Sequence, residues 1–168
     1  MARLRDACPG VRDRAMIEFL YSTGVRVSEM AALDVKDIEM GRQELIVYGK
    51  GSKERKTYLT DSAKFYLKRY LKDRNAQDFE PLFGAEHYPD RRLTVAGIQY
   101  MLRQLGKRAG VEKTHPHRFR RTIATDLLAR GMPIEQVKEF LGHEKLDTTL
   151  IYCTVKEEQV KASHRKYA

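Results

Sequence analysis

Apolar side chains recur at intervals of three and four positions through most of this chain, which is the spacing of an amphipathic α-helix. In the first such segment Met16, Ile17 and Leu20 share one face, and Gly24 follows where the segment ends. Glycine is common just past helix C-termini, so it marks a natural stop. The pattern predicts helices at residues 11–23, 25–33, 61–74, 94–109, 117–130 and 133–141, and a last short helix that begins near Asp147.

A different pattern occurs between the second and third of these helices, where β-branched and aromatic side chains are frequent. The segments ELIVY (44–48) and KTYLT (56–60) are typical of two paired antiparallel strands, and the polar segment 34–43 before them is turn-like. The fold class predicted is therefore α+β, mainly α-helical, with a small antiparallel β-sheet or hairpin. The loop between the strands contains three basic residues, Lys50, Lys53 and Arg55.

This glycine-bearing loop, residues 49–55, does not have the GxxxxGK[ST] order of a phosphate-binding loop, because Gly49-Lys50 is followed by Gly51. Two interpretations remain open. The loop is either an ordinary exposed hairpin tip or a basic finger that enters a DNA groove.

The composition and net charge indicate what kind of molecule the chain binds. The chain has 168 residues, of which 42% are hydrophobic, and carries a formal net charge of +9, so we expect one globular domain with a polyanionic partner. The ordinary alternative is that the charge only aids solubility. No apolar run is long enough to span a membrane or to form a leader, and Cys8 and Cys153 are too far apart in sequence to suggest a zinc knuckle. We expect a reducing, cytoplasmic compartment.

Most of the candidate catalytic and binding residues lie toward the C-terminal end of the chain. His117, Arg120 and Arg121 lie near the start of one predicted helix, where free backbone N–H groups favour an anion. His143 directly follows the end of the next helix, and Tyr152 lies on the last one. Singly, each has an ordinary explanation as a surface residue, a helix cap or a core aromatic. A zinc site is a weak alternative, because no known ligand spacing fits its four candidate ligands, His115, His117, His143 and Cys153.

Together these residue types suit phosphoryl transfer. Two arginines can form forked hydrogen bonds to a phosphate, a tyrosine hydroxyl can attack it, and a lysine on a loop can protonate the departing oxygen. Upstream, Arg26 and Glu29 are three positions apart on a predicted helix and so share a face. The ordinary interpretation of that pair is a surface salt bridge.

Five segments carry a resemblance to a known family. The chain resembles the catalytic domain of the tyrosine recombinases, the phage integrase and Xer-type group. The spacings from Arg120 to His143 and from His143 to Tyr152 are also typical of that group. The matching segments, in the family's order, are STGVRVSE (22–29), VYGKGSKERK (47–56), HRFRRTIAT (117–125), LGHEKLDTT (141–149) and IY (151–152).

The resemblance implies a tyrosine recombinase catalytic-domain fold and a role for each matching residue. Arg26 and Arg120 would hold the scissile phosphate, and Tyr152 would form a 3′-phosphotyrosyl bond. His117 and His143 would contact the phosphate oxygens. The general acid would be Lys50, with Lys53 as the rival assignment. Glu29 would orient an arginine or histidine. DNA contacts are expected at Lys53, Arg55, Arg118 and Arg121, with Arg121 standing where many members have histidine.

The same resemblance implies an organisation and partners. Residues 1–10 would be a linker or tail, 11–155 the catalytic domain, and 156–168 a segment that docks on a neighbouring protomer. The N-terminal DNA-binding domain of the family would be absent, so we expect a monomer alone and a homo-tetramer on double-stranded DNA for the full-length protein. The family requires no metal or cofactor. The resemblance implies site-specific DNA recombination by strand cleavage and rejoining. Two alternatives are a type IB topoisomerase and a non-catalytic DNA-binding module.

Overall fold

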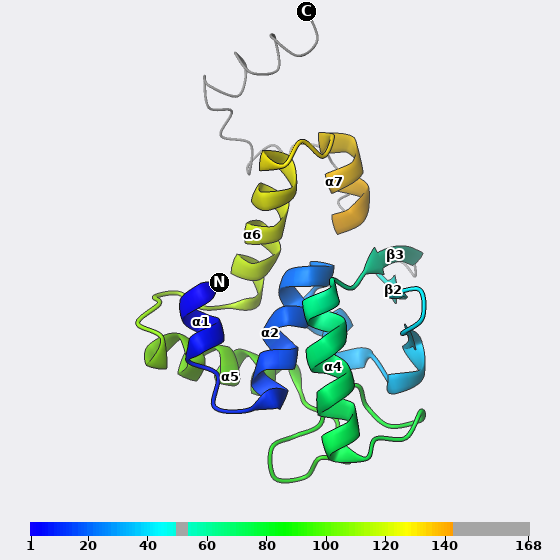
Figure 1. Ribbon diagram of the computed structural model, residues 1–168, viewed down its shortest axis with the longest axis vertical. Helices are drawn as coiled ribbons and strands as arrows, with labels where there is room; N and C mark the ends of the chain where they lie inside the picture. The colour runs from blue at the N-terminus through cyan, green and yellow to red at the C-terminus, as the bar shows by residue number, and fades with distance from the viewer. Residues whose placement is uncertain (50–53, 143–168) are drawn as a thin grey trace, which may run out of the picture.

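A computed structural model describes residues 1–49 and 54–142 (Figure 1). The predicted α+β class is confirmed: helices dominate, and one small antiparallel sheet lies beside them. In chain order the elements are α1 (Ala2–Asp6), α2 (Val11–Thr23), α3 (Val27–Ala32), the 3₁₀ turn η1 (Val35–Asp37), β1 (Ile38–Glu39), β2 (Glu44–Tyr48), β3 (Glu54–Tyr58), α4 (Asp61–Arg74), α5 (Val95–Arg108), α6 (Pro116–Ala129) and α7 (Ile134–Leu141).

Helix α2 lies at the centre of the fold, between α4 and α6 (Figure 1). Its Met16, Ile17 and Phe19 are fully buried, because neighbouring elements cover it on more than one side. Gly24 ends the helix in the left-handed conformation that glycine adopts without steric cost. The chain therefore turns sharply at this point and leads directly into α3.

The sheet has the order β1-β2-β3, with both pairs antiparallel. Leu45, Val47 and Thr57 point into the core, whereas Ile46 and Tyr48 are exposed on the other face. The two-residue strand β1 falls in a segment predicted to be a turn, since it is too short to show an alternating pattern. Strand β3 starts at Glu54, not at the predicted residue 56.

The N-terminal segment is partly helical. We expected residues 1–10 to be a linker or tail, and within them Ala2–Asp6 form helix α1. Leu4 is only 5% exposed and belongs to the main hydrophobic core, and Arg5 donates two hydrogen bonds of 2.8 Å to the buried carboxylate of Glu18. Leu4 and the Arg5–Glu18 ion pair help to hold this short helix, and neither produces a helical repeat in the sequence.

Helices α6 and α7 lie side by side at one end of the molecule (Figure 1). They share a smaller hydrophobic cluster formed by Ile123, Ala124, Val137 and Leu141. Tyr21 on α2 packs against this cluster and donates a 2.6 Å hydrogen bond to Asp126 on α6. The contact fixes α6 relative to the centre of the fold. Within residues 1–49 and 54–142, no helix has the length and apolar character needed to cross a membrane.

Candidate functional site

Arg26 stands at the N-cap of α3, two residues after the turn at Gly24. Its backbone N–H donates a 2.6 Å hydrogen bond to Glu29 Oε2, and its guanidinium group donates one of 2.9 Å to Glu29 Oε1. The predicted contact between these two residues is therefore confirmed. The pair is not an ordinary surface salt bridge, because Glu29 is only 7% exposed.

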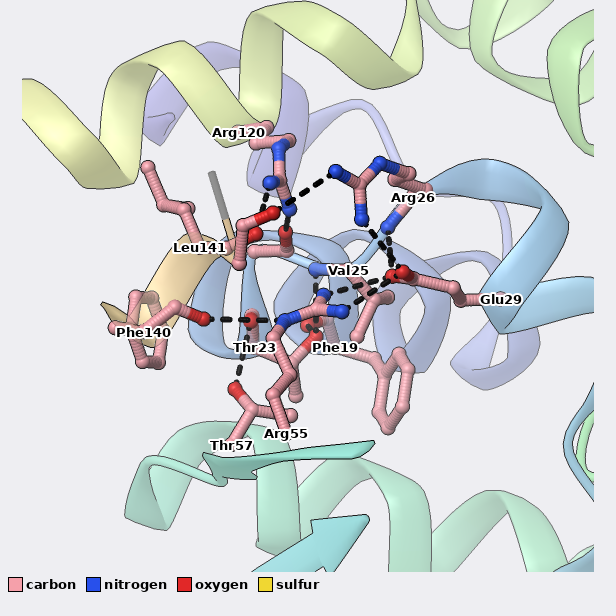
Figure 2. Close-up of polar contacts among 12 residues, drawn as sticks. Phe19, Thr23, Val25, Arg26, Glu29, Arg55, Thr57, Arg120, Phe140 and Leu141 are labelled. Carbon is pink, nitrogen blue, oxygen red and sulfur yellow. Dashed lines mark hydrogen bonds and ion pairs between the residues drawn. The ribbon is translucent and has the colours of Figure 1, made fainter. Parts of the chain in front are cut away.

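A second arginine holds the same carboxylate from the sheet. Arg55 on β3 donates from Nη1 to Glu29 Oε1 and from Nη2 to Glu29 Oε2, both at 2.7 Å (Figure 2). Its Nε donates to the carbonyl oxygen of Phe140 at 3.2 Å. Burial alone would raise the pKa of Glu29, but the hydrogen bonds from Arg55 and from the Arg26 backbone outweigh it and lower that pKa to about 2. Glu29 is thus ionised at every pH at which the protein is normally handled.

The position of Arg55 corrects an expectation. We predicted that it lies in the hairpin loop and contacts DNA, but it lies in β3 and its side chain is only 9% exposed. The reason is the alternation of the strand: Arg55 and Thr57 point inward, while Lys56 and Tyr58 point outward. An inward-facing arginine breaks the usual apolar pattern, so the sequence favoured a loop at this position.

Arg120 reaches the same place from helix α6. It is 4% exposed, and its two terminal nitrogens donate to the carbonyl oxygens of Gly24 and Leu141 (Figure 2). Arg26 donates to the next carbonyl oxygen, that of Gly142, at 3.1 Å. The two arginines expected to hold a phosphate are therefore brought together at the C-terminal end of α7.

The end of helix α7 explains this convergence. The last carbonyl groups of a helix have no partner within it and carry the negative end of its dipole. Here three consecutive carbonyl groups each accept a hydrogen bond from a different arginine. The pairs are Phe140 with Arg55, Leu141 with Arg120, and Gly142 with Arg26.

The remaining predicted site residues fall into two groups. His117, Arg118 and Arg121 are exposed near the start of α6, and Arg118 donates to the carbonyl oxygen of Glu112. His117 is three positions before Arg120 and so lies on the same side of the helix. Lys50, Lys53, His143 and Tyr152 lie outside the described residues, as does Cys153.

The arginine cluster borders a cleft whose walls come from α2, β3, α6 and α7. Arg26, Glu29, Arg55 and Gly142 contribute to it, and Tyr21 contributes farther along. Across residues 1–49 and 54–142, no group of three or more histidine, cysteine or acidic residues is arranged to hold a metal ion.

Comparison with known proteins bears on this arrangement. The model of the phage integrase family matches residues 1–159. The chain belongs to the phage integrase family. This membership confirms the resemblance identified from the five sequence segments.

Members of the family with curated names include tyrosine recombinases of the Xer type. A tyrosine recombinase XerC of Leptospira interrogans is 43% identical over 159 residues, which cover 93% of this chain and 50% of that protein. A tyrosine recombinase XerD of Oceanobacillus iheyensis is 40% identical over 166 residues, covering 94% of this chain and 54% of that protein. The chain thus spans about half the length of the curated relatives it matches.

Solved structures of related recombinases have the same fold as this chain. The crystal structure of XerA recombinase superimposes with a TM-score of 0.83 at 29% identity, covering 99% of this chain and 62% of that one. The XerH site-specific recombinase bound to its difH substrate gives a TM-score of 0.73 at 26% identity, covering 98% of this chain and 47% of that one. The predicted tyrosine recombinase catalytic-domain fold is confirmed.

Proposed function

We propose that this chain cuts and rejoins DNA in site-specific recombination, through a 3′-phosphotyrosyl intermediate on Tyr152. The observation that carries the proposal is the meeting of Arg26 and Arg120 at the end of α7. These residues come from separate parts of the sequence, and each lies in one of the five segments that match the family pattern. The chain directly after Gly142 continues to His143 and then to Tyr152.

The arginines supply positive charge for the phosphate in the proposed reaction. Arg26 has a side chain 39% exposed, so an incoming phosphate can reach it directly. Arg120 is buried, and a buried charge acts in a medium of lower dielectric constant than water. Charge fixed in place before the reaction stabilises the additional negative charge of a transition state without reorganisation. Both side chains are held by backbone carbonyls, which satisfies this condition.

The other roles complete a balanced step. The Tyr152 hydroxyl gives its proton to His117 and its oxygen forms a bond to phosphorus. The bond to the 5′ oxygen breaks, and Lys50 protonates that oxygen. His117 and His143 donate hydrogen bonds to the non-bridging oxygens. Rejoining reverses the step, because the phosphotyrosyl ester retains the energy of the broken bond. Rejoining therefore needs no nucleoside triphosphate as a source of energy.

The test is a covalent adduct that survives denaturing electrophoresis. The substrate is a pool of DNA duplexes of randomised sequence in which one 5′-bridging oxygen is replaced by sulfur, so that cleavage is trapped. We expect an adduct with the chain, or with the chain joined to the N-terminal half of the Leptospira relative. Tyr152→Phe should abolish the adduct, while Tyr100→Phe, which changes a tyrosine 59% exposed on α5, should not. An adduct of unchanged yield in Tyr152→Phe, or none with either unsubstituted protein, overturns the proposal.

Sequencing the trapped DNA separates the alternatives. Enrichment of one sequence supports a recombinase. Adducts without sequence preference, together with relaxation of supercoiled DNA, would favour a topoisomerase-like activity. Binding without any adduct would favour a DNA-binding module.

We further propose that the full-length protein works as a tetramer on two paired DNA sites, with residues 156–168 docking on a neighbouring protomer. The structure of the XerH recombinase bound to its difH substrate supports DNA as the partner. Mass measurement of the complex in solution, with and without trapped DNA, checks the assembly. A chain lacking residues 156–168 should still form adducts but should not form the tetramer.

A further inference from the structure

Arg55 differs from the other two arginines at the end of α7 in what it holds. Arg26 and Arg120 are the residues expected to face the phosphate, whereas Arg55 binds both oxygens of Glu29 and the carbonyl oxygen of Phe140. Each of its three guanidinium nitrogens thus donates a hydrogen bond to the protein. Its neighbour on the strand, Lys56, has a side chain 49% exposed. The Arg55 charge is therefore directed into the protein and not toward a ligand.

The carboxylate of Glu29 is shared between two arginines. Oε1 accepts from the side chains of Arg55 and Arg26, and Oε2 accepts from the side chain of Arg55 and the backbone N–H of Arg26. With both oxygens occupied in this way, Glu29 presents only one oxygen to the Arg26 guanidinium. The other end of that guanidinium group reaches the Gly142 carbonyl.

Removal of Arg55 would release this constraint. A carboxylate with a single arginine partner favours a forked, two-point pair with it. Glu29 would then draw the Arg26 guanidinium away from Gly142, and the Phe140 carbonyl would lose its partner. Strand β3, helix α3 and the end of α7 would no longer be tied to one another through charged groups.

We propose that Arg55 is a positioning residue for strand cleavage, which sets the location of the Arg26 guanidinium through Glu29 and fixes the end of α7 through Phe140. The inference rests on the proposed function. It adds a residue that touches neither DNA nor the reacting atoms. The close approach of Gly142 supports it, because a Cβ built on that glycine would lie 2.7 Å from Cδ of Arg55.

The experiment compares Arg55→Gln with Lys56→Gln. Each variant removes one positive charge from β3, but from opposite faces of the strand. Single-turnover cleavage of a trapped duplex and the affinity for the same duplex at several salt concentrations are measured for both. For Arg55→Gln we expect cleavage to slow by about 10- to 100-fold, which is the size of effect that a small displacement of a catalytic group produces. Its affinity should weaken much less than its cleavage rate, and the slope of that affinity against salt should stay nearly unchanged, because Arg55 itself makes no DNA contact.

Two results of this comparison would overturn the inference. A phosphate contact by Arg55 would reduce the salt slope by about one counterion and weaken binding. Unchanged cleavage in Arg55→Gln would show that the residue is not needed at all. Failure of the unsubstituted chain to cleave is a separate result, because it counts against the proposed function and not against the role of Arg55.

Two further variants test the path through Glu29. In a Glu29→Gln chain, the additional change Arg55→Gln should slow cleavage much less than it does alone, because the residue acts through the missing carboxylate. Arg55→Lys keeps the charge but not the two-point contact, so it should fold and should restore cleavage only in part. Additive defects in the first case, or complete restoration in the second, would contradict the proposed geometry. Thermal unfolding of each variant confirms that rates are compared between folded proteins.

Discussion

Arg26 and Arg120 donate hydrogen bonds to the carbonyl oxygens of two consecutive residues at the end of helix α7. Two guanidinium groups this near to one another repel, and the repulsion must be offset for the fold to hold. The negative end of the helix dipole and the ionised carboxylate of Glu29 provide that compensation. The site is thus an arrangement of positive charge stabilised from within the protein.

The stability of the protein should decrease in acid as Glu29 is protonated. Because its pKa is about 2 in the folded state and near 4.5 otherwise, its contribution is complete above pH 4.5 and is lost as the pH falls toward 2. The contribution amounts to at most about 3 kcal/mol. Urea unfolding of the chain and of Glu29→Gln between pH 6 and 2.5 should show a stability difference that narrows as the pH decreases. A constant difference would show that Arg55 and Arg26 do not lower the pKa of this carboxylate.

Gly142→Ala should destabilise the protein for two reasons. Its φ of +63° is unfavourable for alanine, and the new methyl group would press on the Arg55 side chain. Gly110→Ala is the matched control, because Gly110 has a φ of +60° with nothing within 4 Å of the added carbon. We expect about 1 kcal/mol for the control and about 1–2 kcal/mol more for Gly142→Ala by urea unfolding. Equal losses of stability would mean that the Arg55 side chain moves aside with no loss of free energy.

Tyr21→Phe should lower stability by about 1–2 kcal/mol, since it removes a hydrogen bond to a carboxylate. The bond, from the Tyr21 hydroxyl to Asp126 at 2.6 Å, links α2 to the helix that carries Arg120. Thermal unfolding measures the change, with Tyr100→Phe as the exposed control. A double-mutant cycle with Asp126→Ala should yield a coupling energy of similar size. A coupling energy near zero would contradict the link.

The general acid can be identified by changing the leaving atom. Lys50→Ala should slow cleavage of an ordinary strand by about 10²- to 10⁴-fold, the usual contribution of a general acid. It should slow a strand with a 5′-bridging sulfur far less, because a thiolate leaves without a proton. Lys53→Ala should affect both substrates equally and weakly. The opposite pattern would assign the acid to Lys53, and equal large defects in Lys50→Ala on both substrates would exclude the role.

Cys8 should react slowly with thiol reagents. Burial raises the pKa of this thiol to about 11, with a further contribution from the charge of Asp13, and its Sγ donates to the carbonyl oxygen of Leu4 at 3.2 Å. Only the thiolate is nucleophilic, so alkylation at pH 8 should be about 100-fold slower than in the urea-unfolded chain. Intact-mass measurement on a Cys153→Ser variant isolates this residue. Comparable rates in the two states would show that α1 does not cover it.

Much of the fold was determined by local sequence. Helix boundaries at Gly24, Thr60 and Thr94 follow from the backbone freedom of glycine and from threonine side chains that accept a backbone N–H, and the structure has these boundaries. The contact between Arg26 and Glu29 is also local, because it joins the N-cap residue of α3 to a residue three positions later. Such features depend on residues a few positions apart, so the sequence contains all the information needed for them.

Tertiary structure alone decided which charged groups meet. Nothing near Arg55 in the sequence indicates that its partner is Glu29, and α1 is held by a contact with α2 that leaves no periodic signal. The meeting of Arg26 and Arg120 depends on where α7 ends in space, since the unpaired carbonyls there attract both. The chain itself determined which side chains are available and on which face of each element they lie. Packing of distant elements determined their partners, because the energy of an ion pair depends on separation and burial, and neither is encoded by position along the chain.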